Sequence, residues 1–183
     1  MQELSARTFT AQMRERDRIL LCAMAIPLWW LLPSCKHEIP APLDVELLRL
    51  AQDTSGQVFY HHSDALLPRS AGSGHPQALL RTWYNPAAAA FLDSMGAVVE
   101  DTLFSDGAAV VKELYTAPGT LSLYAIMYKK ADHPNADADG WVWAEVKPSG
   151  EVEIPSSDLG SACRGCHSQS GNIDFTLMNA YFP

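Results

Sequence analysis

The stretch that decides the fold is residues 107–129, which read GAAVVKELYTAPGTLSLYAIMYK. Two runs rich in valine, leucine, isoleucine and tyrosine flank the dipeptide Pro118-Gly119. β-branched and aromatic residues favour strands, and proline followed by glycine is typical of a tight turn. The stretch therefore predicts two antiparallel strands, at 107–115 and 121–129.

Further strands are predicted on both sides of this pair. Residues 78–84 read ALLRTWY and precede it, and residues 141–146 read WVWAEV and follow it. Residues 151–154, after a turn that contains Pro148, predict one more strand, at the edge of the sheet.

Helical signals flank these strands. Asn85-Pro86 supplies an N-cap and a first-turn proline for a helix over 87–95, which Gly96 ends. Asp44 is predicted to cap a short helix at 45–51, and residues 53–77 show no sustained period and predict a loop. The predicted fold class is α+β, a mainly antiparallel sheet with flanking helices.

Composition narrows the function classes. The chain has 183 residues, 48% of them hydrophobic, so it can bury a core and is not a disordered tail. Its formal net charge is -8, which argues against sequence-independent binding to the phosphates of nucleic acids.

The first residues predict export. Arg14, Arg16 and Arg18 precede an uncharged apolar run at 19–32, which is too short to span a bilayer comfortably. This order is typical of an export signal over residues 1–34, and a permanent N-terminal membrane anchor is the alternative. Either way the body is expected outside the cytoplasm, in the periplasm. Leu32-Pro-Ser-Cys35 resembles a bacterial lipobox, which adds a lipid anchor at Cys35 to the expectation, and 35–52 is predicted to hold a tether and the short helix.

The motif that carries chemistry is Cys163-Arg-Gly-Cys166-His167. Two thiols three residues apart can reach the two vinyl groups on one porphyrin edge, and the next histidine can then bind the iron. The motif predicts c-type haem with His167 as the metal ligand, within a domain over residues 53–183. A zinc site would need two further ligands, and a thioredoxin-like redox pair would sit in a βαβ unit.

Two cations in the predicted strands stand beside apolar residues. Lys112 shares a strand face with Val110 and Leu114, so it either reaches water at a sheet edge or strand end, or points its amine at the haem. Arg81 shares a face with Leu79 and Trp83, so it is either paired at the surface or held over the pocket to bind a ligand.

Other residues allow different roles. Met127 or Met178 could bind the iron as a sixth ligand, which would make the protein an electron carrier, or could simply fill the core. Trp141 and Trp143 share a strand face and are expected to pack against the core or the haem. Four histidines are expected to be solvated in loops: His61, His62, His75 and His133.

The chain resembles the cytochrome P-460 family, which includes the cytochromes c prime beta. The matching segments run in family order from residue 78 to the end and include Arg81-Thr-Trp-Tyr-Asn-Pro86, Asp106-Gly-Ala-Ala-Val-Val-Lys-Glu-Leu-Tyr115, Leu123-Tyr-Ala-Ile-Met-Tyr-Lys129, Trp141-Val-Trp143, the haem motif and Asp174-Phe175.

The resemblance implies a small, mainly antiparallel haem protein, usually a homodimer, with five-coordinate iron and an open distal side. It implies that Lys112 is bonded to the porphyrin edge, that Arg81 is a distal residue, and that the ligand is a small nitrogen species: hydroxylamine to be oxidised or nitric oxide to be bound. A redox partner cytochrome is then expected. The family's distal glutamate has no counterpart in residues 123–129, which argues against efficient hydroxylamine oxidation.

Overall fold

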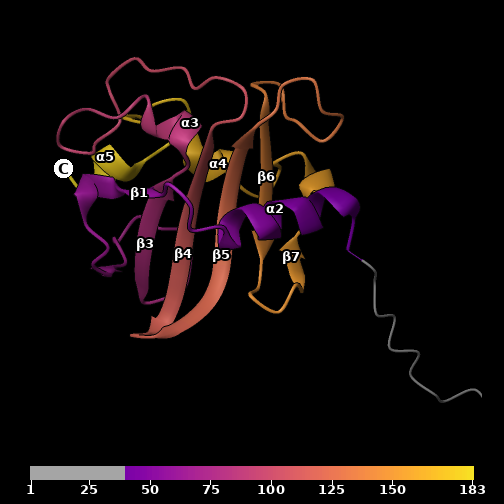
Figure 1. The fold of residues 1–183 in the computed structure, drawn as a ribbon, viewed down its shortest axis with the longest axis horizontal. Helices are drawn as coiled ribbons and strands as arrows, with labels where there is room; N and C mark the ends of the chain where they lie inside the picture. The colour runs from indigo at the N-terminus through magenta and orange to yellow at the C-terminus, as the bar shows by residue number, and fades with distance from the viewer. Residues whose placement is uncertain (1–39) are drawn as a thin grey trace, which may run out of the picture. The chain divides into compact units, whose positions relative to one another are not determined.

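The structure, a computed structural model, describes residues 40–183. This part of the chain contains a seven-stranded antiparallel sheet (Figure 1). The strands are β1 (Val58–Phe59), β2 (Leu67–Pro68), β3 (Leu79–Tyr84), β4 (Ala109–Ala117), β5 (Thr120–Lys129), β6 (Trp141–Val146) and β7 (Val152–Ile154). The α-helices and 3₁₀-helices are α2 (Pro42–Gln52), η2 (Tyr60–His62), α3 (Pro86–Ala89), η3 (Ser156–Asp158), α4 (Arg164–His167) and α5 (Met178–Tyr181). The predicted α+β class is confirmed.

The predicted hairpin forms the centre of the sheet. Strands β4 and β5 pair in antiparallel register, with Lys112 opposite Ala125, and the sheet order is β1-β3-β4-β5-β6-β7, with β2 also pairing with β3. The three strands predicted before and after the hairpin are present within a few residues of their expected bounds, and β7 is an edge strand as predicted.

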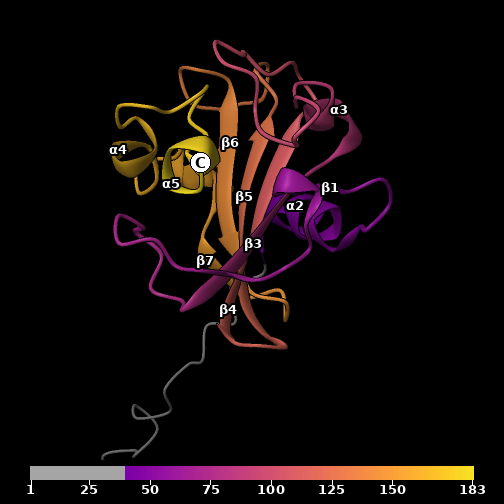
Figure 2. The same ribbon diagram turned by 90° about the vertical axis from the view of Figure 1, so that its left-hand side faces the viewer.

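The two faces of the sheet carry separate cores. On one face α2 packs against side chains such as Trp83, Val111 and Ile126. The other face, which α4 and α5 cover, packs around Leu114, Trp141 and other large apolar residues (Figure 2). Because successive side chains in a strand point to opposite faces, the register of each strand decides which core a residue joins.

The helix predicted at 87–95 is much shorter than expected. Asn85 caps it as predicted, since its Oδ1 accepts a hydrogen bond of 2.9 Å from the amide of Ala88. The helix ends at Ala89, and Leu92 then forms an antiparallel bridge with Val98. The Asp93 carboxylate accepts amide hydrogen bonds within this turn, so the chain reverses where the sequence predicted another helical turn.

The predicted N-cap of the first helix is wrong. Helix α2 begins at Pro42, whose fixed φ suits the first helical turn, and Asp44 therefore lies inside the helix. Its buried carboxylate accepts a hydrogen bond of 2.8 Å from the amide of Ser156. This bond joins α2 to η3, which leads toward the cysteine motif.

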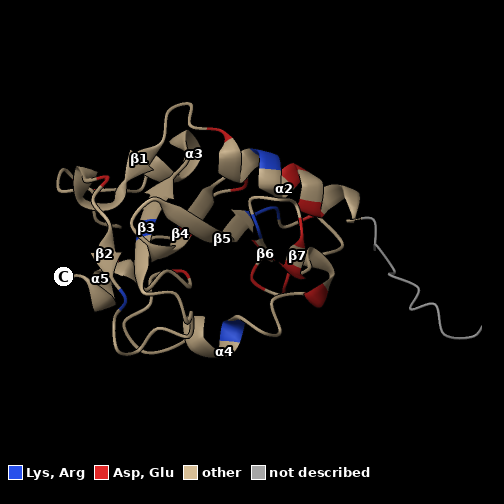
Figure 3. Ribbon diagram, turned by 90° about the horizontal axis from the view of Figure 1, so that it is seen from below, with Lys and Arg blue, Asp and Glu red and all other residues tan. Residues whose placement is uncertain are grey.

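Three predictions lie outside the described residues: the export signal, the lipid site at Cys35 and most of the tether. Within residues 40–183, no helix has the length and apolar character needed to cross a bilayer. Acidic residues gather around β6 and β7, beside the segment that leads to α4 (Figure 3).

Candidate functional site

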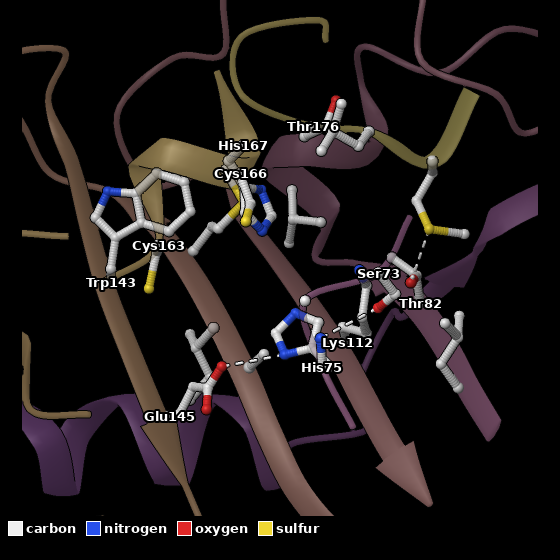
Figure 4. A pocket seen from close by; sticks show the side chains of 18 of the residues that line it. Ser73, His75, Thr82, Lys112, Trp143, Glu145, Cys163, Cys166, His167 and Thr176 are labelled. Carbon is white, nitrogen blue, oxygen red and sulfur yellow. Dashed lines mark hydrogen bonds and ion pairs between the residues drawn. The ribbon is translucent and has the colours of Figure 1, made fainter. Parts of the chain in front are cut away.

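A cavity of about 270 Å³ lies on the face of the sheet that α4 and α5 cover. Its walls come from strands β3 to β6, from the loop between β2 and β3, and from the C-terminal segment (Figure 4). Most of the lining is apolar, so the few polar side chains that reach it lie in an environment where charge is costly.

The cysteine motif enters this cavity from α4. Cys163 directly precedes the helix, and Cys163, Cys166 and His167 all line the cavity. The turn before the helix can lie against the sheet because residue 160 is glycine, with φ +71°, and a Cβ at that position would overlap the ring of Trp143. The structure thus brings both thiols and the imidazole to one wall.

His167 is held with one ring nitrogen free. Its Nδ1 lies 2.8 Å from the carbonyl oxygen of Phe175, so the N–H at this position donates to that carbonyl. The ring also packs edge-on against Trp143, with centroids 5.1 Å apart. Burial, together with the positive charge of Lys112, lowers the pKa of His167 to about 4, so the ring is neutral and Nε2 keeps its lone pair.

These residues fit a c-type haem. A metal-binding histidine usually donates its second ring N–H to a carbonyl or carboxylate, which is what His167 does. Both thiols are free, and burial raises the pKa of Cys163 to about 12, so it is protonated in this cavity. The apolar walls suit a porphyrin, which is itself largely apolar.

Lys112 lies in the same cavity, on the central strand β4 (Figure 4). The prediction that it reaches water at a sheet edge is therefore wrong. Burial lowers the pKa of Lys112 to about 8, although the nearby carboxylate of Glu145 opposes this shift. From the definition of a pKa, about a tenth of the Lys112 side chains then carry a neutral, nucleophilic amine at pH 7.

Arg81 is not in the cavity. Thr82, not Arg81, pairs with Lys112 across β3 and β4, and Arg81 therefore faces the opposite side of the sheet. There its guanidinium donates to the Glu113 carboxylate at 2.8 Å and to the Tyr115 hydroxyl at 3.1 Å. The prediction that Arg81 is a distal residue of the cavity is therefore wrong. Arg81 is ion-paired, as the alternative expected, but its partner Glu113 is only 9% exposed and the pair does not lie at the surface.

A carboxylate that the sequence did not predict reaches the cavity from β6. Glu145 lies on β6 and lines the cavity, next to β5, where residues 123–129 offered no acid. Strand alternation could have identified it, since Glu145 shares a face with Trp141 and Trp143. The cavity therefore contains a carboxylate, although residues 123–129 do not supply it.

His75 also lines the cavity, although it was predicted to be solvated. Its side chain is 16% exposed, and its Nδ1 lies 3.1 Å from Oε1 of Glu145, which is likewise 16% exposed. The loop between β2 and β3 has no period, so the sequence contains no signal for where this side chain points.

Both methionines proposed as a sixth ligand line the cavity and belong to its apolar core. The hydroxyl of Thr82 donates to the sulfur of Met178 at 3.2 Å. Within the described part of the chain, no three His, Cys, Asp or Glu side chains gather in a group that could hold a metal ion between them.

Asp137 ties the motif helix to the sheet. Its side chain is 2% exposed and accepts hydrogen bonds from Nε1 of Trp143 at 2.7 Å and from Nη1 of Arg164 at 2.5 Å. Burial alone would raise the pKa of Asp137, but these bonds and amide bonds from Trp141 and Asp139 lower it below its ordinary value.

Replacing Asp137 with alanine is expected to lower the free energy of unfolding by about 3 kcal/mol, because it leaves a buried indole N–H and a guanidinium without their acceptor. Urea denaturation of the haem-loaded protein measures this. Because the folded-state pKa is depressed, the stabilisation is full above the ordinary pKa of aspartate and is lost as pH falls through the folded-state pKa.

The matched control is Asp139→Ala. Asp139 pairs with the other amine of the same Arg164 guanidinium, but its side chain is 45% exposed, so its loss should cost less than about 1 kcal/mol. An equal loss of unfolding free energy in the two variants would show that burial of Asp137 does not stabilise α4.

No known family model matches this chain, and no curated protein is similar enough to match it.

Proposed function

We propose that this chain is an exported c-type haem protein, similar to the cytochrome P-460 family, that binds or oxidises a small nitrogen species in its cavity. One observation carries the proposal: both thiols of the motif and the free Nε2 of His167 line one apolar cavity. The proposal also draws on the order of the segments that resemble the family.

Cys163 and Cys166 would hold the haem through thioether bonds, and His167 would bind its iron. When bound, the haem supplies an iron atom that can carry a small ligand and change its oxidation state. The protein's own contribution lies in orientation and environment. The Phe175 carbonyl fixes the plane and the tautomer of His167, and the ring of Trp143 packs against it.

The apolar walls would exclude bulk water from the bound ligand, and a small number of polar groups would orient it. Lys112 and Thr82 lie opposite each other on adjacent strands and face the cavity together. Under this proposal Lys112 is bonded to the porphyrin edge, as in the P-460 proteins that the chain resembles. Periplasmic location, lipid attachment at Cys35, a homodimer and a redox partner cytochrome belong to the same proposal.

The test uses protein matured in a host that exports it and attaches haem. Titration with nitric oxide is expected to show one ligand bound per haem, and the ferric absorption spectrum is expected to be five-coordinate and high-spin. Consumption of hydroxylamine with an added electron acceptor then separates oxidation from binding alone. Fully loaded protein that binds neither nitric oxide nor hydroxylamine would contradict the proposal.

The second candidate function is an electron carrier, favoured by the presence of Met127 and Met178 on the cavity wall. It predicts a six-coordinate, low-spin spectrum and no change on addition of nitric oxide. Replacing the two methionines one at a time with leucine, which keeps most of the side-chain volume, identifies the ligand. If the unmodified protein and both variants all show a five-coordinate, high-spin spectrum, this alternative is excluded.

A further inference from the structure

We propose that His75 is the proton acceptor of the cavity and that Glu145 is the residue that positions it. The inference rests on the proposed function, since the proton comes from a small protic ligand bound in the cavity. It concerns a loop histidine and a strand carboxylate that lie 70 residues apart in the sequence but meet on one wall of the cavity, with 3.1 Å between Nδ1 of His75 and Oε1 of Glu145.

The loop that carries His75 is fastened at several points. The Ser73 hydroxyl accepts a hydrogen bond from the amide of His75 at 3.3 Å. Gly72 lies against the ring of Tyr181, where a Cβ would come within 2.7 Å, and its carbonyl accepts from the Tyr181 hydroxyl at 3.4 Å. The loop is therefore held against α5, and His75 is directed at the cavity rather than at solvent (Figure 4).

Glu145 is fixed more firmly because it lies within a paired strand. It is opposite Ala125 on β5 and opposite Ile154 on β7, so its backbone is held from both sides. Its carboxylate is the partner of His75 and also interacts with the positive charge of Lys112. The acid thus faces one imidazole and one amine from two different elements.

The pairing decides which nitrogen of His75 can react. A carboxylate at Nδ1 favours the tautomer that carries its proton there, so Nε2 has the lone pair. Among residues 40–183, Nε2 of His75 has no hydrogen-bond partner, and the side chain lines the cavity. Nε2 is therefore available to a ligand.

The chemical step is a proton transfer. An N–H or O–H bond of the ligand breaks, its electron pair stays on the ligand, and the proton bonds to Nε2 of His75. The resulting imidazolium is balanced by the Glu145 carboxylate, which lowers the cost of creating a cation between apolar walls. Lys112 is less suited to this role, because under the proposed function its amine is bonded to the porphyrin edge.

The experiment compares two ligands of the ferric, haem-loaded protein. Hydrogen cyanide must lose a proton to bind iron as cyanide, whereas nitric oxide binds without any proton transfer. In His75→Gln the amide can still donate to Glu145 but cannot accept the proton. Stopped-flow mixing is expected to show cyanide association slowed about 100-fold, in line with the contribution of a positioned general base, with nitric oxide association unchanged.

Glu145→Gln tests the positioning role. We expect cyanide association to slow about tenfold, again without an effect on nitric oxide, because the imidazole remains but loses its orienting partner. In the double variant the second change should add nothing, since Glu145 acts through His75. His62→Gln is the matched control, because His62 is an exposed histidine outside the cavity, and both association rates should stay as they are.

Three results would overturn the inference. Equal slowing of both ligands in His75→Gln would show a steric effect of the loop. A change from a low-spin to a high-spin ferric spectrum would make His75 an iron ligand instead of a base. An unchanged cyanide rate would show that the proton goes elsewhere. Absence of haem from the unmodified protein is a separate result, which contradicts the proposed function itself.

Discussion

Replacing both Cys163 and Cys166 with alanine is expected to abolish covalent haem attachment completely. The protein should then have the mass of the polypeptide alone under denaturing conditions, whereas the unmodified protein gains the mass of one haem. Both thiols line the cavity beside the imidazole of His167, so no other described cysteine can replace them. Each single variant should retain one thioether at most, because each thiol reaches one vinyl group.

Denaturing mass spectrometry and the visible absorption of the purified protein provide the measurement. Ser168→Ala is the control, since it changes a residue next to the motif without removing a thiol or the imidazole. A colourless unmodified protein from a host that loads other c-type cytochromes would refute the haem assignment, as would a double variant that keeps its covalent haem.

Replacing Lys112 with alanine is expected to remove the second covalent link to the porphyrin while leaving the thioether links intact. Lys112 faces the cavity from β4, and burial lowers its pKa to about 8, which makes a neutral nucleophilic amine available. The strongly red-shifted ferrous Soret band expected of the linked protein should return to that of an ordinary c-type haem. Joining the amine nitrogen to a ring carbon removes one hydrogen from each, so a two-electron oxidant such as a peroxide must be supplied.

The link should be detected directly as a haem peptide that contains Lys112 after proteolysis. Its yield should rise with pH through about 8, because the neutral amine is the form that reacts and burial has lowered the pKa of Lys112 to that value. Lys130→Ala is the control, since Lys130 is exposed and paired with Glu46. An unshifted spectrum with no such peptide in peroxide-treated protein would contradict the link.

Strand alternation predicted most of the sheet, because β4, β5 and β6 each carry apolar residues that must be buried on one face or the other. It did not predict that Arg81 and Lys112 face opposite sides. Each lies among apolar neighbours in its own strand, and only the pairing of Thr82 with Lys112 assigns Arg81 to the other core. A shift of one residue in that register would have reversed the result.

Local interactions account for the other differences. The side chains of Asp44 and Asp93 accept hydrogen bonds from amides, one across the fold and one within a turn, and neither partner can be recognised from the sequence. Strand alternation could have predicted that Glu145 faces the cavity. It could not have predicted this for His75, because the loop held by Tyr181 has no periodic pattern. The motif itself was recognisable because its chemistry is confined to consecutive residues.

The attachment motif comes late in the chain, after every strand that lines the cavity. Strands β3 to β6 end at Val146, and Cys163 follows η3. During synthesis the N-terminal part of a domain emerges first, so strands β3 to β6 emerge before the two thiols. Under the proposed function, haem attachment would then be a closing step, in which the segment that carries the two thiols seals the haem against strands that have already emerged.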